Sequence, residues 1–196
     1  EVDFYQNAGA AADLSPAILE RTLFHCTGSY FVPNVKATAY CCRTNLAPNT
    51  AFRGFGGPQG MFVIEPALFK AAAALGMSPA DIQEKNLLED GDTFPYGMTA
   101  RRCSAPVCWQ EAKSRYNYKE TLKRVEAFNT SHVLEKKGLA FMPVCFGISF
   151  TNTALNQGSA LVHVYTDGSL SVSTGAVEMG QGVKYKILEV AARVFS

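Results

Sequence analysis

The feature that most constrains this fold is a glycine-rich segment, residues 51–60, that directly precedes a long apolar stretch. Gly54, Gly56 and Gly57 stand within four positions, and Pro58 follows them. Glycine tolerates positive φ and close approach of the backbone, and proline is favoured in the first turn of a helix. The segment therefore predicts a tight turn that opens a helix whose free N–H groups could face an anion. A plain turn with a surface arginine at Arg53 is the alternative, because short motifs often match by chance.

The rest of the chain predicts strands and helices mixed along the sequence, which is an α+β class. Strand signals come from β-branched and aromatic runs, and helix signals from apolar residues three and four positions apart. Ser15-Pro16 and Ser78-Pro79 each place a capping hydroxyl before a first-turn proline. Strands are predicted at 2–6, 31–42, 139–150 and, as a hairpin, 160–174. Helices are predicted at 15–25, 61–75, from 78 onward, 107–128 and 183–195.

Several finer expectations accompany these elements. Pro66 predicts a kink or a later start for the helix at 61–75, and Gly76 is a plausible cap at its end. Alternation predicts core packing for Phe146 and Ile148 in the strand at 139–150. The hairpin has its turn at 166–169, and four apolar side chains are expected on its buried face: Val162, Val164, Leu170 and Val172.

Composition excludes several classes of protein. The formal net charge of +1 argues against a dedicated nucleic-acid binder, which would usually present a basic face. No apolar run is as long as a membrane-spanning helix, and no signal peptide is visible at the start of the chain. The six cysteines form no C-x-x-C pair and have no histidine at metal-ligand spacing, so free thiols are expected and a zinc site is not.

Two further segments could carry chemistry, each with a plainer alternative. In 179–182 small residues and Gln181 precede a predicted helix, which suits a phosphate but also suits an ordinary strand-to-helix connection. Phe150 could present its ring to a planar ligand or pack in the core. Arg21 lies on a predicted helix beside Glu20, and from the pattern alone it would be an exposed side chain or a weak ion pair.

Taken together, these segments form an ordered set of motifs. The set comprises LERTLFH (19–25), NTAFRGFGGPQG (49–60), FGISFT (146–151), LNQGSALVHVYTDGS (155–169) and EMGQG (178–182). Their sequence and order resemble the molybdenum hydroxylase family, in its xanthine dehydrogenase branch. The resemblance spans essentially the whole chain and implies a fragment of the molybdopterin-binding domains.

The resemblance implies an enzyme of purine metabolism that hydroxylates hypoxanthine and xanthine to urate at a molybdenum–pterin centre. It leaves open whether that cofactor has the cytosine dinucleotide form. It further implies that electrons leave through two [2Fe–2S] clusters and FAD, carried by the remaining parts or subunits, to NAD or O₂. A purine substrate, a cytoplasmic location and a homo-oligomer of the intact enzyme are expected, with no nucleic-acid or membrane partner. The cofactor does the difficult chemistry, while the protein supplies orientation and electrostatics.

The family's site residues map onto matching positions of this sequence. Arg21 matches the arginine that orients substrate and stabilises charge in the transition state, and it is the one catalytic residue expected here. Phe55 and Phe150 match the two phenylalanines that hold the purine ring, and Thr151 matches a substrate-side threonine. The expected cofactor contacts are Phe52, Arg53, Gly180, Gln181 and Gly182, with the backbone of Arg53 lying near the molybdenum.

Arg21 also favours one branch of the family, because aldehyde oxidases usually lack this arginine. The chain begins inside a predicted strand and stops inside a predicted helix, so an internal piece is expected, and the family's base glutamate would lie beyond Ser196. Residues 1–131 are expected to be the C-terminal part of a first cofactor-binding subdomain, and 132–196 the start of a second. Two alternatives remain: an aldehyde oxidase-type hydroxylase, or a non-catalytic globular module that retains the fold.

Overall fold

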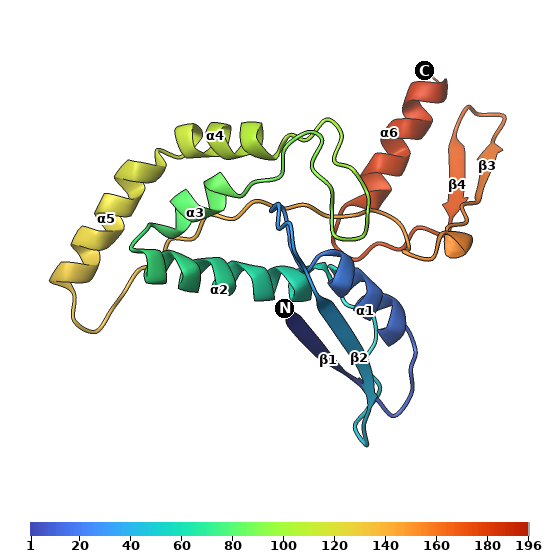
Figure 1. The fold of residues 1–196 in the computed structure, drawn as a ribbon. Helices are drawn as coiled ribbons and strands as arrows, with labels where there is room; N and C mark the ends of the chain where they lie inside the picture. The colour runs from blue at the N-terminus through green and yellow to red at the C-terminus, as the bar shows by residue number, and fades with distance from the viewer. Residues whose placement is uncertain (196) are drawn as a thin grey trace. The chain divides into compact units, whose positions relative to one another are not determined.

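The chain divides into two compact units, Glu1–Ile148 and a second that starts at Ser149, in a computed structural model that describes residues 1–195. The predicted mixture of helices and strands is confirmed (Figure 1). The division between the compact units falls at residues 148 and 149. The boundary expected between the two cofactor-binding subdomains, at residues 131 and 132, is a different kind of division and stays a prediction.

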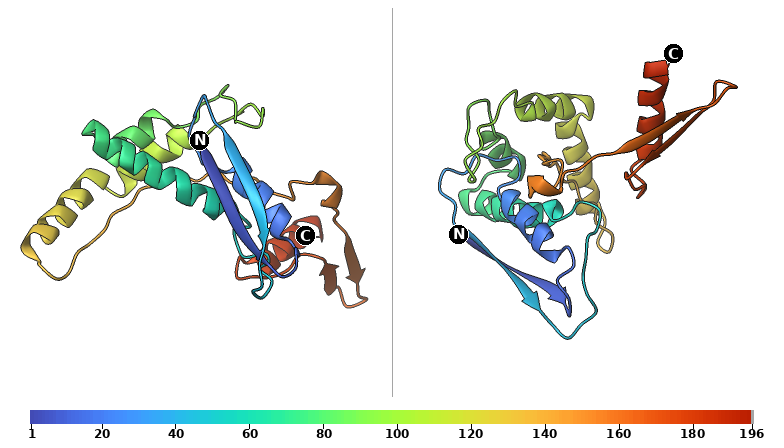
Figure 2. Two further views of the ribbon diagram at one scale, coloured as in Figure 1. Left: turned by 60° about the horizontal axis from the view of Figure 1, so that its bottom comes forward. Right: turned by 90° about the vertical axis from the view of Figure 1, so that its right-hand side faces the viewer.

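The first unit opens with a parallel pair of strands joined through a helix. β1 (Val2–Gly9) pairs in parallel with β2 (Ala37–Arg43), and α1 (Ser15–Phe24) forms the crossover between them (Figures 1 and 2). The rings of Tyr5 and Tyr40 stack across the pair with their centroids 4.9 Å apart. Because β2 begins at Ala37, the extended stretch predicted at 31–42 forms a regular strand only over its second half. α1 contacts β2 and α2 and so places its own residues between the sheet and the next helix.

α2 (Gly57–Leu75) begins at the glycine turn rather than at Met61 as predicted. Gly56 before the helix and Gly76 after it both have left-handed backbone, and Pro66 lies inside the helix. The early start follows from Pro58, which fits the first turn because it has no N–H to satisfy. α3 (Pro79–Lys85) begins at the predicted cap, where the Ser78 Oγ accepts a hydrogen bond from the backbone N–H of Asp81 at 3.2 Å.

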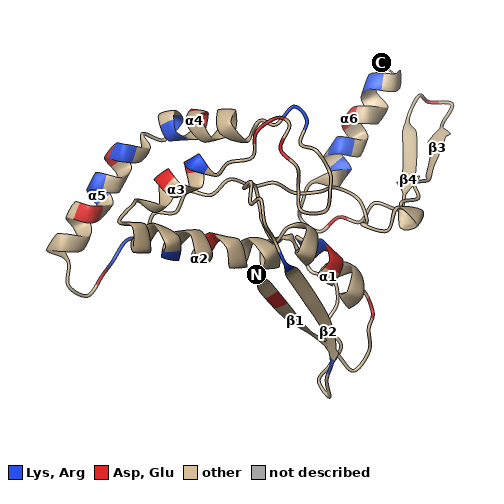
Figure 3. Ribbon diagram, in the orientation of Figure 1, with Lys and Arg blue, Asp and Glu red and all other residues tan. Residues whose placement is uncertain are grey.

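The single helix predicted at 107–128 is wrong, because the chain forms two helices there. They are α4 (Ala105–Arg115) and α5 (Tyr118–Ser131), and charged side chains are interspersed along both (Figure 3). Asn117 separates them in the left-handed region with φ 46°. Asparagine is one of the few residues that adopt this conformation at low cost, and one such residue ends the helical hydrogen-bond ladder.

The strand predicted at 139–150 is also wrong. Residues 139–148, here called the strap, run without regular secondary structure, and no strand of the described residues lies beside them to complete a ladder. Side chains hold the strap instead. The Gln83 Nε2 donates to the Phe141 carbonyl at 2.9 Å, and the Phe141 ring packs on Trp109 with centroids 4.1 Å apart.

The core of the first unit gathers around Tyr30 and Trp109, with Ala80 and Leu87 buried beside them. Tyr30 donates its hydroxyl to the Glu65 carboxylate at 2.6 Å, and Gln83 donates to the other Glu65 oxygen at 2.7 Å. Burial raises the pKa of Glu65 and of Tyr30. This polar network joins α2, α3 and the strap inside an otherwise apolar core.

The second unit contains a short 3₁₀ helix, η1 (Thr153–Leu155), a hairpin and a last helix. The predicted hairpin is confirmed, with β3 (Ala160–Val164) antiparallel to β4 (Leu170–Thr174), and α6 (Val183–Phe195) follows as predicted. The expected buried face is wrong for Val162 and Val164, which are exposed, whereas Leu170 and Val172 are half-buried. Within this unit, apolar residues of β4 and α6, Leu170, Val172 and Ile187 among them, line a common pocket.

Two remaining expectations concern membranes and thiols. Among residues 1–195 no single helix has the length and apolarity of a membrane span, and α2 with α3 reaches that size only as a pair bent by 111°. All six cysteines are free thiols.

Candidate functional site

Arg21 lies on α1 and is buried, with 5% of its surface exposed. The exposed arginine that the pattern alone would allow is therefore wrong. Its Nη1 donates to the carbonyl oxygen of Gly147 in the strap, and its guanidinium lies over the Phe146 ring, 5.3 Å from the centroid. Burial lowers the pKa of Arg21, but a guanidinium stays charged in proteins. The first unit thus holds a fixed positive charge on the inner side of α1.

The glycine turn packs directly against α1. The Thr22 hydroxyl lies within hydrogen-bond distance of two carbonyl oxygens, 3.0 Å from that of Ile18 and 3.1 Å from that of Gly56. A Cβ at Gly56 would lie 2.2 Å from the Ile18 carbonyl oxygen, and one at Gly57 would lie 2.4 Å from the Phe146 ring. These two glycines are therefore required for packing between α2, α1 and the strap. The predicted turn that opens a helix is confirmed.

The residues ahead of these glycines face solvent. Phe52 is 83% exposed and Arg53 is also exposed, whereas Phe55 is half-buried in the left-handed region with φ 49°. The N–H of Phe55 donates to the carbonyl of Phe52 at 2.8 Å and closes the turn. No side chain caps the first turn of α2. The Gly57 N–H nevertheless donates to the Gly54 carbonyl at 3.0 Å, so the exposed charge of Arg53 is the feature of this turn that suits an anionic group.

In the second unit, the Met179–Gly182 turn is organised by its own side chains. The Glu178 carboxylate accepts hydrogen bonds from the N–H groups of Gly180 and Gly182 at 2.9 Å each, and these bonds lower the pKa of Glu178. Gln181 accepts from the Met179 N–H at 2.5 Å and donates to the Val177 carbonyl at 2.7 Å. A carboxylate of the chain thus occupies the position at the start of α6 that the sequence suggested for a phosphate.

Phe150 and Thr151 lie at the beginning of the second unit and are half-buried. The Phe150 N–H donates to the Asn156 Oδ1 at 2.7 Å, and the Asn156 amide donates back to the Phe150 carbonyl at 3.1 Å. The side chain of Asn156, which sequence reasoning missed, therefore fixes this stretch of backbone.

The structure brings the predicted residues together in two groups. Arg21 and the 52–55 turn share the first unit, linked through Thr22 and Gly56. Phe150, Thr151 and the Met179–Gly182 turn belong to the second. The core packing predicted for Phe146 and Ile148 is wrong, because these side chains are 43% and 88% exposed. The Phe146 ring packs on Arg21 and His25 instead.

Sequence reasoning also missed His25. This residue is buried, with its Nδ1 2.8 Å from the carbonyl oxygen of Arg21 and its Nε2 accepting the Gly147 N–H at 2.9 Å. Burial is the main cause that lowers its pKa, and the Arg21 charge adds to it. The only available signal was the spacing of four residues from Arg21, which places both side chains on one face of a helix.

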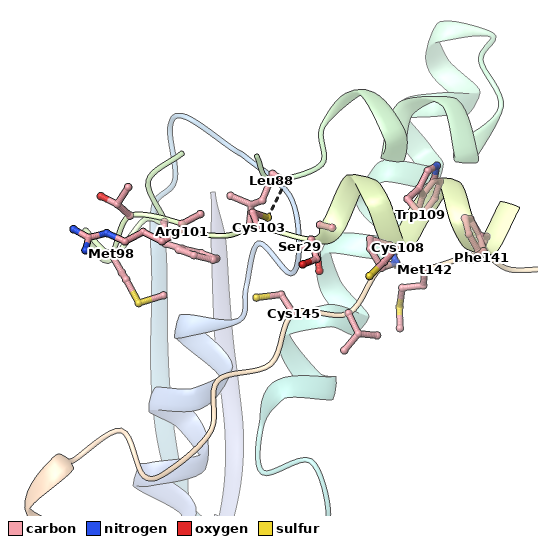
Figure 4. Close-up of a pocket in the computed structure, with 18 of the residues that line it drawn as sticks. Ser29, Leu88, Met98, Arg101, Cys103, Cys108, Trp109, Phe141, Met142 and Cys145 are labelled. Atoms are coloured by element: carbon pink, nitrogen blue, oxygen red, sulfur yellow. Dashed lines mark hydrogen bonds between the residues drawn. The ribbon is translucent and has the colours of Figure 1, made fainter. Parts of the chain in front are cut away.

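The first unit also holds a large cavity (Figure 4). It has a volume of about 1010 Å³ and is lined mainly by apolar side chains, with Cys103, Cys108 and Cys145 among them. Burial raises the pKa of the Cys145 thiol. None of the residues predicted to bind substrate or cofactor lines this cavity.

Comparison with protein families matches both ends of the chain to the same type of domain. Residues 1–87 match a molybdopterin cofactor-binding domain, and residues 111–196 match a second one. The xanthine dehydrogenase/oxidase of Gallus gallus is 44% identical over 193 residues, and that of Felis catus is 42% identical over 193 residues. Xanthine dehydrogenase 1 of Arabidopsis thaliana is 42% identical over 196 residues. The alignments cover 98%, 98% and 100% of this chain but only 14% of the length of each of these proteins.

Solved structures share the fold. The aldehyde oxidoreductase from Desulfovibrio gigas has a TM-score of 0.66 at 23% identity, with 87% of this chain and 18% of that chain covered. Quinoline 2-oxidoreductase from Pseudomonas putida 86 has a TM-score of 0.66 at 20% identity, covering 91% of this chain and 24% of that chain. At such identities the likeness concerns the fold alone.

Proposed function

Because this chain belongs to the molybdopterin cofactor-binding domains of the molybdenum hydroxylases, we propose that the protein that carries it hydroxylates purines, taking hypoxanthine and xanthine to urate. Identity of 42% to 44% to proteins named xanthine dehydrogenase, over nearly the whole chain, supports this substrate class. The observation that carries the proposal is the buried, fixed guanidinium of Arg21.

The residues of the first unit fit a molybdenum–pterin cofactor. The exposed side chain of Arg53 in the turn before α2 offers positive charge, which suits a polar, anionic group, although the N–H groups of Phe55 and Gly57 already donate within the turn. When bound, the cofactor supplies the oxidation chemistry at the purine carbon. We assign Phe52 and Arg53 to hold it from this side, with the Arg53 backbone facing the metal.

On the second unit we assign Gln181 to the cofactor, with Gly180 and Gly182 shaping the turn that carries it, since their N–H groups already donate to Glu178. Gln181 uses its carbonyl oxygen on Met179 and one N–H on Val177, which leaves a second amide hydrogen for a ligand. The turn is rigid because Glu178 accepts from two of its N–H groups. The nucleotide form of the cofactor, the cytosine dinucleotide included, is left open by these contacts.

Arg21 acts on the substrate. A guanidinium cannot lose its charge near neutral pH, so it donates hydrogen bonds to the purine and stabilises negative charge that develops on it in the transition state. The Gly147 carbonyl and the Phe146 ring hold this side chain before substrate arrives, so little reorganisation accompanies the reaction. An aldehyde has no purine ring to which the guanidinium could donate hydrogen bonds.

Three other side chains complete the proposed substrate contacts. Phe55 and Phe150 would hold the purine ring, since aromatic rings favour stacked and edge-on pairs, and Thr151 would offer a hydroxyl. Phe55 is half-buried in the turn before α2, and Asn156 fixes the backbone that carries Phe150. Phe55 belongs to the first unit, and Phe150 and Thr151 belong to the second.

The proposal extends to the rest of the protein. We assign two [2Fe–2S] clusters and FAD to its remaining parts or subunits, with electrons passed to NAD or O₂, and we expect a cytoplasmic homo-oligomer. No observation in the structure favours an aldehyde oxidase-type reaction or a non-catalytic module over purine hydroxylation, and the aldehyde oxidoreductase likeness concerns the fold.

Replacing Phe55 tests the substrate assignment. In the full-length protein Phe55→Ala is expected to lower kcat/KM for xanthine about tenfold, because the ring contact that orients the purine is lost. Urate formation is measured at fixed molybdenum content. Phe62→Ala is the matched control, since that ring lies on α2 and is 77% exposed. Absence of xanthine turnover by the wild-type, molybdenum-loaded protein, or unchanged kinetics in Phe55→Ala with a normal control, would contradict the assignment.

A further inference from the structure

We propose that His25 is a positioning residue, which sets the guanidinium of Arg21 by holding Gly147 of the strap. The inference rests on the proposed function, because it takes Arg21 as the group that orients the purine. It goes beyond it by naming a residue that touches neither substrate nor cofactor and yet determines substrate preference.

The imidazole of His25 has two different partners, and these define its tautomer. Nδ1 lies 2.8 Å from the carbonyl oxygen of Arg21, and Nε2 lies 2.9 Å from the backbone nitrogen of Gly147. A carbonyl oxygen can only accept and an amide N–H can only donate. Nδ1 therefore carries the proton and Nε2 is the bare acceptor, which requires the neutral ring. Burial favours that neutral form by lowering the pKa of His25.

Gly147 connects the imidazole to the guanidinium. Its N–H donates to His25, and its carbonyl accepts from the Arg21 Nη1. A Cβ at this position would lie 2.7 Å from the Arg21 Nη1 and 3.6 Å from the His25 ring. A side chain at this position would displace the Arg21 Nη1, so the absence of one lets Gly147 contact both Arg21 and His25.

Phe146 supports the same arrangement from the neighbouring position. The centroid of its ring lies 5.1 Å from the centroid of the His25 ring and 5.3 Å from the Cζ atom of the Arg21 guanidinium. The strap has no regular secondary structure to hold it, so the His25 bond is one of the few polar contacts that fix this end of it. Without that bond the Gly147 carbonyl is held less firmly, and one of the contacts that hold the long arginine side chain is weakened.

The consequence for catalysis is specific. A charge that has to be placed within a fraction of an ångström of its productive position depends on the residues that lock its rotamer. Loss of the hydrogen bond from Gly147 to His25 should lower turnover of a substrate that needs Arg21, a purine, while an aldehyde, which does not need it, should be affected much less.

Two conservative variants of the full-length enzyme separate the contacts of His25. A glutamine at position 25 carries an amide oxygen at about the reach of Nε2 and can still accept the Gly147 N–H, whereas an asparagine reaches only as far as Nδ1. The test is to measure kcat/KM for xanthine and for a small aromatic aldehyde in three variants, at equal molybdenum content: His25→Gln, His25→Asn and Arg21→Met. His132→Asn, at an exposed histidine of the same unit, is the control.

The expected result is that His25→Asn lowers the ratio of xanthine to aldehyde kcat/KM about tenfold, the effect of one lost hydrogen bond, and that His25→Gln stays within about threefold of wild type. Gly147→Ala gives the same test from the other side, because the new methyl group displaces the Arg21 Nη1, a flexible end, rather than backbone. It should lower the ratio with His25 intact, and it covers the case in which the His25→Asn variant does not fold.

Other outcomes overturn the proposal. If Arg21→Met lowers the ratio but His25→Asn and Gly147→Ala do not, His25 is no positioning residue and the substrate assignment stands. If His25→Asn reduces xanthine and aldehyde turnover equally, its role is structural only. If Arg21→Met leaves the ratio unchanged, the purine assignment fails, and the inference fails with it.

Discussion

At position 21 a charged side chain is buried on α1 because a carbonyl oxygen 126 residues further along the chain reaches it. Local sequence can place Arg21 on a helix, but it cannot show that Gly147 and Phe146 return to cover it, so the pattern alone predicted exposure. The same applies to His25, whose two partners are four and 122 residues away. The motif resemblance identified Arg21 without showing what holds it in place.

The neutral imidazole of His25 predicts a pH dependence of stability. Its pKa in the folded protein lies below its ordinary value of about 6.5, so on acidification the unfolded chain takes up the proton first. The contribution of His25 to the free energy of unfolding is therefore constant above about pH 6.5. It falls as the pH drops from there to the pKa of the folded state, by at most about 1.4 kcal/mol per pH unit. His25→Gln, which does not titrate, should lose less melting temperature than wild type between pH 7.5 and 5.5. Parallel losses in the two proteins would count against this account.

At the scale of elements, local signals predicted what local chemistry determines. The Ser78 cap, the Gly76 end of α2 and the hairpin turn at 166–169 were found because each depends on residues within a few positions. The predictions failed where tertiary partners decide. The strap is as apolar as a strand but pairs with no strand in the described residues. α4 and α5 separate at Asn117, where two residues change the direction of the chain.

The network that ties α2, α3 and the strap together predicts a local loss of stability. Tyr30→Phe removes a buried hydroxyl that donates to the half-buried Glu65 carboxylate at 2.6 Å, which should cost about 1 kcal/mol of local stability. Hydrogen exchange of peptides that span 26–32 and 139–145 in the full-length protein measures this opening free energy. Tyr116→Phe, at a tyrosine that is 70% exposed, should change it by less than about 0.5 kcal/mol. Equal exchange in both variants would show that the hydroxyl contributes little.

At the scale of the whole molecule, the chain spans 14% of the length of the relatives that it matches, and much of its apolar surface is uncovered. β3 and one side of α6 expose apolar side chains such as Val162, Val164 and Leu188. No sequence pattern could have predicted this exposure, because alternation indicates an apolar face but not what covers it.

The isolated 196-residue chain is accordingly expected to retain little molybdenum. The cofactor contacts assigned here come from exposed turns in two units, and such contacts bind tightly only when the surrounding protein fixes them. Metal analysis of the purified chain, expressed with the cofactor supplied, should give far less than one molybdenum per chain, while the full-length protein approaches one. Near-stoichiometric molybdenum on the isolated chain would refute this expectation.

The most direct test of the central claim is the substrate preference of Arg21→Met in the full-length protein. Removing a buried, charge-bearing donor that acts on the purine in the transition state should lower kcat/KM for xanthine about 100-fold, with a much smaller effect on an aromatic aldehyde. A ratio that falls in this way supports purine hydroxylation with Arg21 as the orienting charge. Equal losses for both substrates, or none for either, would contradict it.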